Sequence, residues 1–244
     1  MKPLRSLIAG AAMLTTASTS WGIGIEIDKF LNTDMVDSFT EDLGAALSYK
    51  AVTPAEPLGL IGIDIGLEIT ATDLANIDKY QAAFGTTEDS VLLPLPKLHV
   101  HKGLPMGIDL GLVYSKVPTT DIGYIGGEIR YSPLGGNVAL PAVAVRGTYT
   151  TLLGVDGASL STKGVELTVS KGFLMLTPYA GIGNVWANST IETGLPLIGD
   201  LEGEASMFKW FVGLNLNLGL MNLVYETDTT GDSMSHSVKM GFRF

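Results

Sequence analysis

Apolar residues occupy every second position along most of the chain, from about residue 42 onward. Over 60–70, isoleucine and leucine alternate with glycine, Asp64 and Glu68, and 106–115 repeats the arrangement around Asp109. The same alternation is found at 124–131, 143–149, 164–170, 208–219 and 221–228. A period of two residues is typical of a β-strand with one apolar and one polar face. We therefore predict an all-β chain of antiparallel strands.

Three features favour a membrane-spanning barrel over the alternative, a soluble β-sandwich. The polar faces are rich in glycine, which suits the inner wall of a curved sheet. The strands run for about 11 to 15 residues, longer than usual and long enough for a tilted span of a bilayer. Aromatic residues lie near the strand ends on the apolar face, as lipid–water interfaces favour. These interface aromatics are Tyr49, Tyr114, Tyr131, Tyr149, Trp186, Trp210, Tyr225 and Phe244.

The connections between strands indicate an up-and-down barrel of about 12 strands, with 10 to 14 compatible with the pattern. Tight turns alternate with longer, acidic connections, of which 71–90 and 188–204 are the longest. Counting back from the C-terminus gives about eleven strands, the first near 42–52. Because bacterial barrels have even strand numbers, one more is expected. We assign it to 23–29, and the alternative is that 23–41 plugs the lumen.

Two segments have helical patterns. In 34–43, Asp34 is placed to cap a helix, and Met35 and Phe39 fall on one face with Leu43. A second short helix is expected within 72–85, in an outer loop.

Residues 1–22 have the pattern of a secretory signal peptide, with Lys2 and Arg5 before an apolar stretch and small residues near Ser20. The barrel domain would then be 23–244. The net charge of −10 argues against nucleic acid as a partner. The chain has no cysteine, which excludes disulfides, thiolate metal sites and a lipid-modified cysteine.

The last residues, 236–244 (HSVKMGFRF), alternate up to a terminal aromatic side chain. This stretch resembles the β-signal of Gram-negative outer-membrane proteins. The resemblance implies that Met240, Phe242 and Phe244 are recognised by the outer-membrane assembly machinery, and that the protein is located in the Gram-negative outer membrane among its lipids.

Three further blocks, 41–74, 95–115 and 170–190, resemble a family of uncharacterised proteobacterial outer-membrane barrels. The resemblance implies the fold and the location, and it implies no activity.

Candidate chemistry is sparse. His99 and His101 share the inward face of one strand, but Lys97 and Lys102 flank them and disfavour a bound cation. His236 follows serines, yet strand parity turns it away from Ser237. We expect no catalytic site, no metal and no cofactor, so the protein is not expected to be an enzyme.

Charged residues projecting into the lumen are the remaining candidates. They are Asp64, Glu68, Asp109, Glu128, Arg130, Arg146, Glu166, Lys209, Glu226, Lys239 and Arg243. Buried charges must pair or contact water, so this set either lines a narrow polar conduit or forms a salt-bridged filling. The first hypothesis is a channel or transporter for small solutes or apolar molecules. The alternative is a non-transporting structural or surface-interaction barrel.

Overall fold

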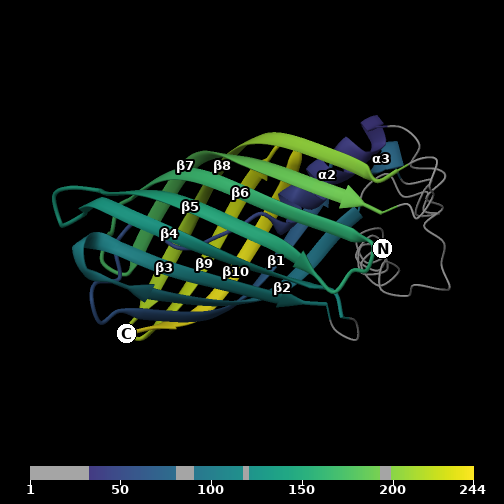
Figure 1. The fold of residues 1–244 in the computed structure, drawn as a ribbon. Helices are drawn as coiled ribbons and strands as arrows, with labels where there is room; N and C mark the ends of the chain where they lie inside the picture. Colours follow the sequence, from purple (N-terminus) through teal and green to yellow (C-terminus); the bar gives the residue numbers. More distant parts are fainter. Residues whose placement is uncertain (1–32, 81–90, 118–120, 193–198) are drawn as a thin grey trace, which may run out of the picture.

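A computed structural model describes residues 33–80, 91–117, 121–192 and 199–244. Within these residues, ten antiparallel strands form a closed barrel in which each strand pairs with its neighbour in sequence and β1 closes on β10 (Figure 1). The strands are β1 (Ile63–Leu74), β2 (Val91–Gly103), β3 (Ile108–Lys116), β4 (Gly123–Gly135), β5 (Ala142–Leu153), β6 (Ala158–Ser170), β7 (Leu176–Ile191), β8 (Leu201–Leu218), β9 (Met221–Thr230) and β10 (Ser233–Arg243).

The outer wall of the barrel is apolar. On β1, Ile65, Leu67 and Ile69 are 43%, 66% and 63% exposed, while the residues between them face inward. Closure of the sheet between β1 and β10 removes the free edges that an open sheet would have. A closed barrel with an apolar exterior is stable in hydrocarbon, because its backbone groups pair within the sheet. No helix among the described residues is long and apolar enough to cross a membrane.

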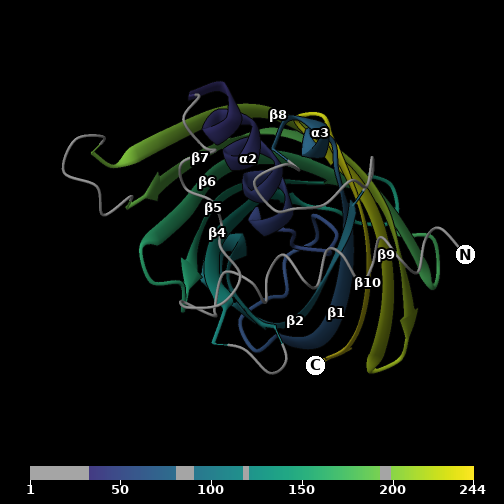
Figure 2. The same cartoon turned by 90° about the vertical axis from the view of Figure 1, so that its right-hand side faces the viewer.

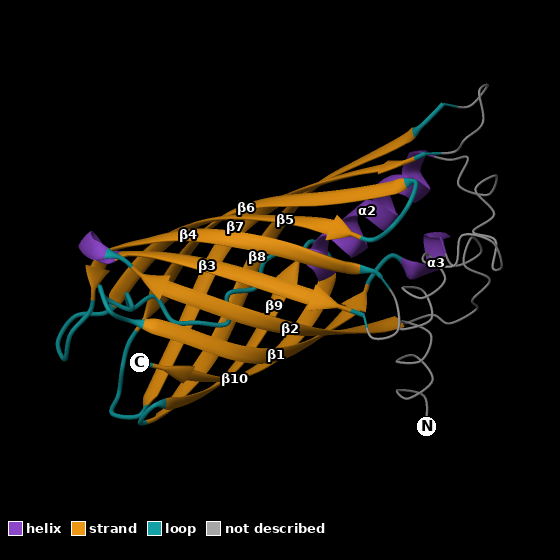
Figure 3. Ribbon diagram, turned by 60° about the horizontal axis from the view of Figure 1, so that its bottom comes forward, coloured by secondary structure: helices purple, strands orange, loops and turns teal. Residues whose placement is uncertain are grey.

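The barrel has two different ends. The C-terminus lies at one end, and the two longest connections, β1–β2 and β7–β8, lie at the other (Figures 1 and 3). We call these the turn end and the loop end. The turn end includes the 3-10 turn η3 (Pro105–Gly107). The tight turns predicted at 102–105, 132–137, 170–173 and 218–221 all fall at the turn end.

The N-terminal part of the described chain lies inside the barrel. Helix α2 (Thr33–Leu47) lies within the ring of strands at the loop end (Figure 2). Residues 48–62, which we call the lumen segment, then run to the turn end, where β1 begins. Lys50 contacts Asp228 on the way, and Thr53 contacts Arg243 near the C-terminus.

The observed strand number is ten, which lies within the expected range but differs from the predicted 12. The strand predicted near 42–52 is wrong: 42–47 belong to α2 and the rest to the lumen segment. The apolar residues of this segment pack against the inner wall of the barrel, where Gly44 lies close to Ala187 and Met207. The helix predicted over 34–43 is confirmed, and residues 33–41 are helical rather than a strand.

Some predicted segments are only partly covered. The predicted strand at 23–29 and the signal peptide lie outside the described residues. Of the helix expected within 72–85, β1 takes the start and helix α3 (Ile77–Tyr80) the middle, while 81–85 lie outside the described residues.

The inward glycines make room for aromatic rings. Gly213 lies opposite Tyr179, and Gly181 lies opposite Phe211, in the pairing of β7 with β8. A Cβ atom at either glycine would overlap the opposing ring. The two rings therefore lie across bare backbone, which explains why the polar face of these strands is rich in glycine.

Candidate functional site: the charged lumen

The predicted lumen charges all come from strands and point into the barrel. All except Arg243 are between 0% and 5% exposed: Asp64, Glu68, Asp109, Glu128, Arg130, Arg146, Glu166, Lys209, Glu226 and Lys239. The side chain of Arg243, at the turn end, is 22% exposed. Since an aqueous channel would leave such residues in contact with solvent, these side chains are not lining open water.

A chain of ion pairs crosses the middle of the lumen. Arg146 places Nε 2.7 Å from Oε2 of Glu128 and Nη1 2.8 Å from Oε2 of Glu166. The other oxygen of Glu166 lies 2.7 Å from Nζ of Lys209, which also donates to the backbone carbonyl of Tyr49 at 3.0 Å. The chain connects β4, β5, β6 and β8, and it ends on the lumen segment.

Glu68 is the centre of a second group. Its Oε1 lies 2.7 Å from Nζ of Lys97, and its Oε2 lies 2.6 Å from Nε2 of His99. Thr70 donates a hydrogen bond to the same carboxylate and accepts one from Lys97 at 2.7 Å. Lys97, His99 and Thr70 therefore surround a carboxylate that is wholly buried.

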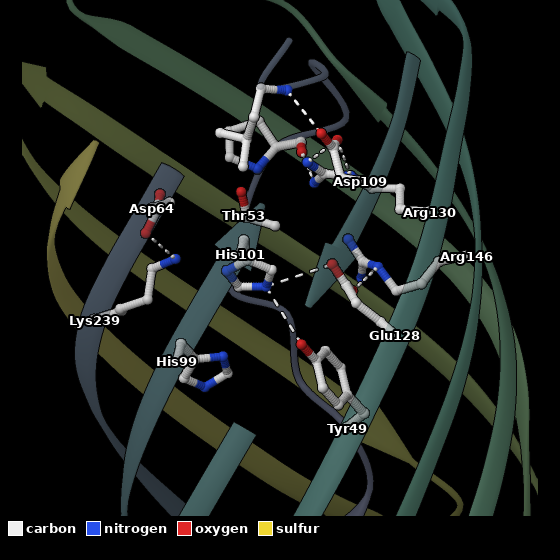
Figure 4. Close-up of polar contacts among 12 residues, drawn as sticks. Tyr49, Thr53, Asp64, His99, His101, Asp109, Glu128, Arg130, Arg146 and Lys239 are labelled. Carbon is white, nitrogen blue, oxygen red and sulfur yellow. Dashed lines mark hydrogen bonds and ion pairs between the residues drawn. The ribbon is translucent and has the colours of Figure 1, made fainter. Parts of the chain in front are cut away.

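His99 and His101 point inward from β2, with their rings stacked at a centroid distance of 5.7 Å. Nε2 of His101 lies 3.3 Å from the hydroxyl of Tyr49 and 3.4 Å from Oε1 of Glu128 (Figure 4). Each imidazole therefore faces a carboxylate. Among the described residues, no group of three or more histidine, cysteine or acidic side chains is arranged to hold a metal ion.

Arg130 fastens the lumen segment near the turn end. Its Nη2 lies 2.7 Å from Oδ2 of Asp109, and its Nη1 donates to the carbonyl of Pro54 at 2.7 Å (Figure 4). Oδ1 of Asp109 accepts from the backbone N–H of Leu58 at 3.1 Å. Both members of this pair therefore hold the wall and the lumen segment together.

Asp64 forms the last ion-pair group at the turn end. It lies 3.5 Å from Lys239 and 2.8 Å from Arg243, and Asn222 donates to it at 2.8 Å. Glu226, by contrast, accepts a hydrogen bond from the hydroxyl of Tyr179 at 2.7 Å.

The sequence analysis missed three buried charges, which are Lys50, Asp42 and Asp228. Lys50 of the lumen segment lies 3.0 Å from Asp228. Asp42 of α2 accepts from the backbone and side chain of Asn76 and from Ser233, at 2.9 to 3.1 Å. Lys50 and Asp42 both connect the N-terminal part to the loop end of the wall.

The predicted interface aromatics lie on the outer wall with one exception. Tyr114, Tyr131, Tyr149, Trp186, Trp210 and Tyr225 are between 38% and 50% exposed. The prediction for Tyr49 is wrong: this residue is 1% exposed and lies inside the barrel on the lumen segment. The strand parity that placed it outside does not apply, since the segment is not part of the sheet.

The residues that resemble a β-signal face outward at the C-terminal end of β10. Met240, Phe242 and Phe244 are 53%, 50% and 61% exposed. The backbone of Phe244 exchanges two hydrogen bonds with Ile63, at 2.9 and 3.1 Å, next to the seam between β1 and β10. Recognition of these residues by an assembly machinery stays a prediction.

His236 lies on the outer wall, where its ring stacks on Tyr225 at a centroid distance of 6.3 Å. Ser235 and Ser237 are buried on the opposite, inward face. The imidazole and these hydroxyls therefore point away from each other, so they do not form a nucleophile–base pair.

No protein-family model and no curated protein matches the sequence. Similar solved structures include the N-terminal β-barrel domain of Pseudomonas aeruginosa OprF, at 16% identity and a TM-score of 0.35, covering 76% of this chain and 99% of that one. KdgM porin gives 10% identity and a TM-score of 0.36, covering 75% and 99%. Ail of Yersinia pestis gives 11% and 0.30, covering 76% and 99%. Scores this low carry no argument about family or function.

Proposed function

We propose that the protein is a barrel of the Gram-negative outer membrane that is closed in its resting form by its own lumen segment. It acts there as a structural or surface-interaction barrel rather than as an open channel. The apolar outer wall and its aromatic residues support a place in a membrane.

The filled lumen is the observation that carries this proposal. A barrel of about eight strands is just wide enough for its own side chains to fill. Ten strands enclose more space, and α2 with the lumen segment occupies it. Apart from Glu226, the inward charges form ion pairs with one another, and Arg130 and Lys209 also donate hydrogen bonds to this segment. They are therefore not free to select ions.

The loop end is the surface offered to a partner. Exposed acidic residues there include Asp73, Asp121, Asp156, Glu202, Glu204 and Asp232. A surface of this sign attracts basic partners and repels anionic ones. A partner that contacts the loop end should therefore carry positive charge.

Cysteine accessibility tests the closed lumen, because the chain has no cysteine of its own. Thr168 is 1% exposed on the inward face of β6. In intact membranes, Thr168→Cys should not react with a charged, membrane-impermeant maleimide. The control Asp156→Cys, at the exposed loop end, should react fully. Equal reactivity at both positions would mean that water reaches the lumen, and the proposal would fail.

A further inference from the structure

The turn end of the barrel carries exposed apolar side chains. In the described chain, the end of the lumen segment and the turns β2–β3, β4–β5, β6–β7 and β8–β9 meet there (Figures 1 and 3). Each of these five connections has a large apolar residue that is at least 60% exposed: Ile61, Met106, Val138, Leu174 and Leu220. Turns in water are mostly built from polar residues, glycine and proline, and a larger exposed apolar patch marks an interaction site.

Two of these apolar side chains are held by a strained backbone. Met106 and Leu174 have φ angles of 64° and 54°, in the left-handed region. Glycine occupies this region at two neighbouring turns, where Gly136 and Gly219 both have a φ angle of 74°, and it does so without strain. The sequence therefore places a long apolar side chain at two positions where glycine would be more stable. Strain of this kind is retained where the side chain has a function.

On β3 and β8, the apolar outer wall has a polar border toward the loop end and none toward the turn end. The outward positions of β8 change from Glu204 to Trp210 and then stay apolar as far as Leu218. On β3 the border is Lys116, and every outward position from there to Met106 is apolar. The surface that faces lipid on the wall therefore continues onto the turns without a boundary.

Two lysines lie at this edge, and each binds the backbone of a neighbouring connection. Nζ of Lys171 donates to the carbonyls of Asn137 and Val138 at 2.9 and 2.7 Å. Nζ of Lys102 donates to the carbonyl of Leu60 at 2.9 Å. In water, solvent would hydrogen-bond to these carbonyls, whereas in a lipid phase backbone groups need partners within the protein. Long basic side chains behave in this way at membrane interfaces.

The height of the wall places the tips of the turns at the lower edge of the hydrocarbon. From Trp210 to Leu218, β8 advances about 20 Å along the barrel axis, at about 3.3 Å per residue and a tilt of about 40°. From Tyr114 to Ile108, β3 advances about 15 Å by the same measure. The apolar band of an outer-membrane barrel is about 25 Å tall. The turns that follow these strands therefore lie at the edge of the band rather than far out in solvent.

We propose that the turn end is a membrane-docking surface, which inserts into the boundary between headgroups and acyl chains of the phospholipid leaflet on its side of the membrane. Ile61, Met106, Val138, Leu174 and Leu220 contact the upper acyl carbons there. A soluble protein partner would need a polar rim around the apolar patch, and the continuous wall does not provide one. Because Ile61 belongs to the lumen segment, this contact also anchors the segment that fills the barrel. The inference rests on the proposed membrane location.

Fluorescence quenching at single cysteines tests this surface, because the chain has no cysteine of its own. Leu174→Cys in the full-length mature protein is labelled with the fluorophore NBD and reconstituted in phosphatidylcholine vesicles. Lipid brominated close to the headgroup should quench this label. Aqueous iodide, present on both sides of the membrane, should quench it several-fold less than it quenches a label at the exposed Asp156→Cys at the loop end. Leu67→Cys is the control for lipid contact, since Leu67 is 66% exposed on the outer face of β1.

Val138→Cys gives a second reading on another turn. Its backbone is not among the positive-φ positions, so the result does not depend on how cysteine tolerates the left-handed conformation of Leu174. The same pattern of quenching is expected at both positions. Quenching by lipid at only one of the two would overturn a surface formed by all the turns.

The negative outcomes are distinguishable. If iodide quenches Leu174→Cys as strongly as Asp156→Cys while lipid still quenches Leu67→Cys, the docking surface is overturned and the membrane location stands. If lipid does not quench Leu67→Cys, the membrane location is overturned, and the docking surface with it. Protection of Leu174→Cys from both quenchers would show that a second copy of the chain covers the turns, and it would also overturn the proposal.

Discussion

Replacing Arg130 by methionine tests how the lumen segment is held. Arg130 is completely buried and serves both Asp109 and the carbonyl of Pro54. Methionine keeps an unbranched apolar side chain but has no hydrogen-bond donor and no charge. Asp109 would keep the N–H of Leu58, at 3.1 Å, as its hydrogen-bond donor, and the carboxylate would be left buried without its cation.

The expected cost follows from these contacts. Removing one partner of a buried ion pair costs about 3–5 kcal/mol, since it leaves an uncompensated charge. The variant Asp109→Asn in the Arg130→Met background removes that charge. A loss of about 1–3 kcal/mol should then remain, from the carbonyl of Pro54 that has lost its donor. The double variant should therefore be more stable than Arg130→Met alone.

The assay is reversible urea unfolding of the reconstituted barrel, followed by tryptophan fluorescence. Lys116→Met is the matched control, because Lys116 lies 3.6 Å from Asp121 with both side chains exposed. It should change stability by less than about 1 kcal/mol. If Arg130→Met also costs less than about 1 kcal/mol, its ion pair behaves as a solvated one, and the argument for a dry lumen is refuted.

Three further predictions concern other parts of the molecule. Burial raises the pKa of Glu41 on α2 above its ordinary value of 4.5. Its ionisation therefore lowers the free energy of unfolding as pH rises from 4.5 toward the raised pKa. Glu41→Gln should remove this part of the dependence of stability on pH, measured by urea unfolding. Gly213→Ala should lower the free energy of unfolding by about 1–3 kcal/mol in the same assay, because the added Cβ overlaps the ring of Tyr179. The control Gly127→Ala has more open space and should stay within about 0.5 kcal/mol of the parent. Equal losses of stability in the two variants would refute the packing argument. Deletion of Phe244 should lower the amount of folded protein in the outer membrane of expressing cells, and normal assembly would contradict its proposed role as a signal.

The sheet was predictable because its signal is local. An alternating strand with one apolar face fixes which residues point outward, so Leu67 and Glu68 could be assigned to opposite faces from the sequence alone. The start of the lumen segment gave a misleading signal, because its alternation predicted a strand of the wall. Its apolar residues, including Val52, are buried by the inner wall of a barrel formed by strands far away in the sequence. For the same reason Tyr49 was placed outside, and the number of strands was overestimated.

The charged lumen was predictable in its members but not in its pairs. Parity places Glu166 and Lys209 inside, but these residues come from β6 and β8, which are not adjacent in the sheet. Their contact depends on the curvature of the wall, which no short-range pattern encodes. Lys50 was missed because its segment was predicted to be a strand of the wall, and its ion pair with Asp228 depends on that segment lying inside the barrel.

Single-channel recording across a planar bilayer tests the central claim most directly. The mature protein is refolded, its folding is verified, and the current is recorded under voltage in symmetric salt. A lumen filled by α2 and residues 48–62 predicts insertion without discrete conductance steps. Stable, reproducible open steps from the unmodified, fully folded barrel would contradict the account, because they would require a continuous aqueous path where the structure places Arg130, Arg146 and Lys209 in dry ion pairs.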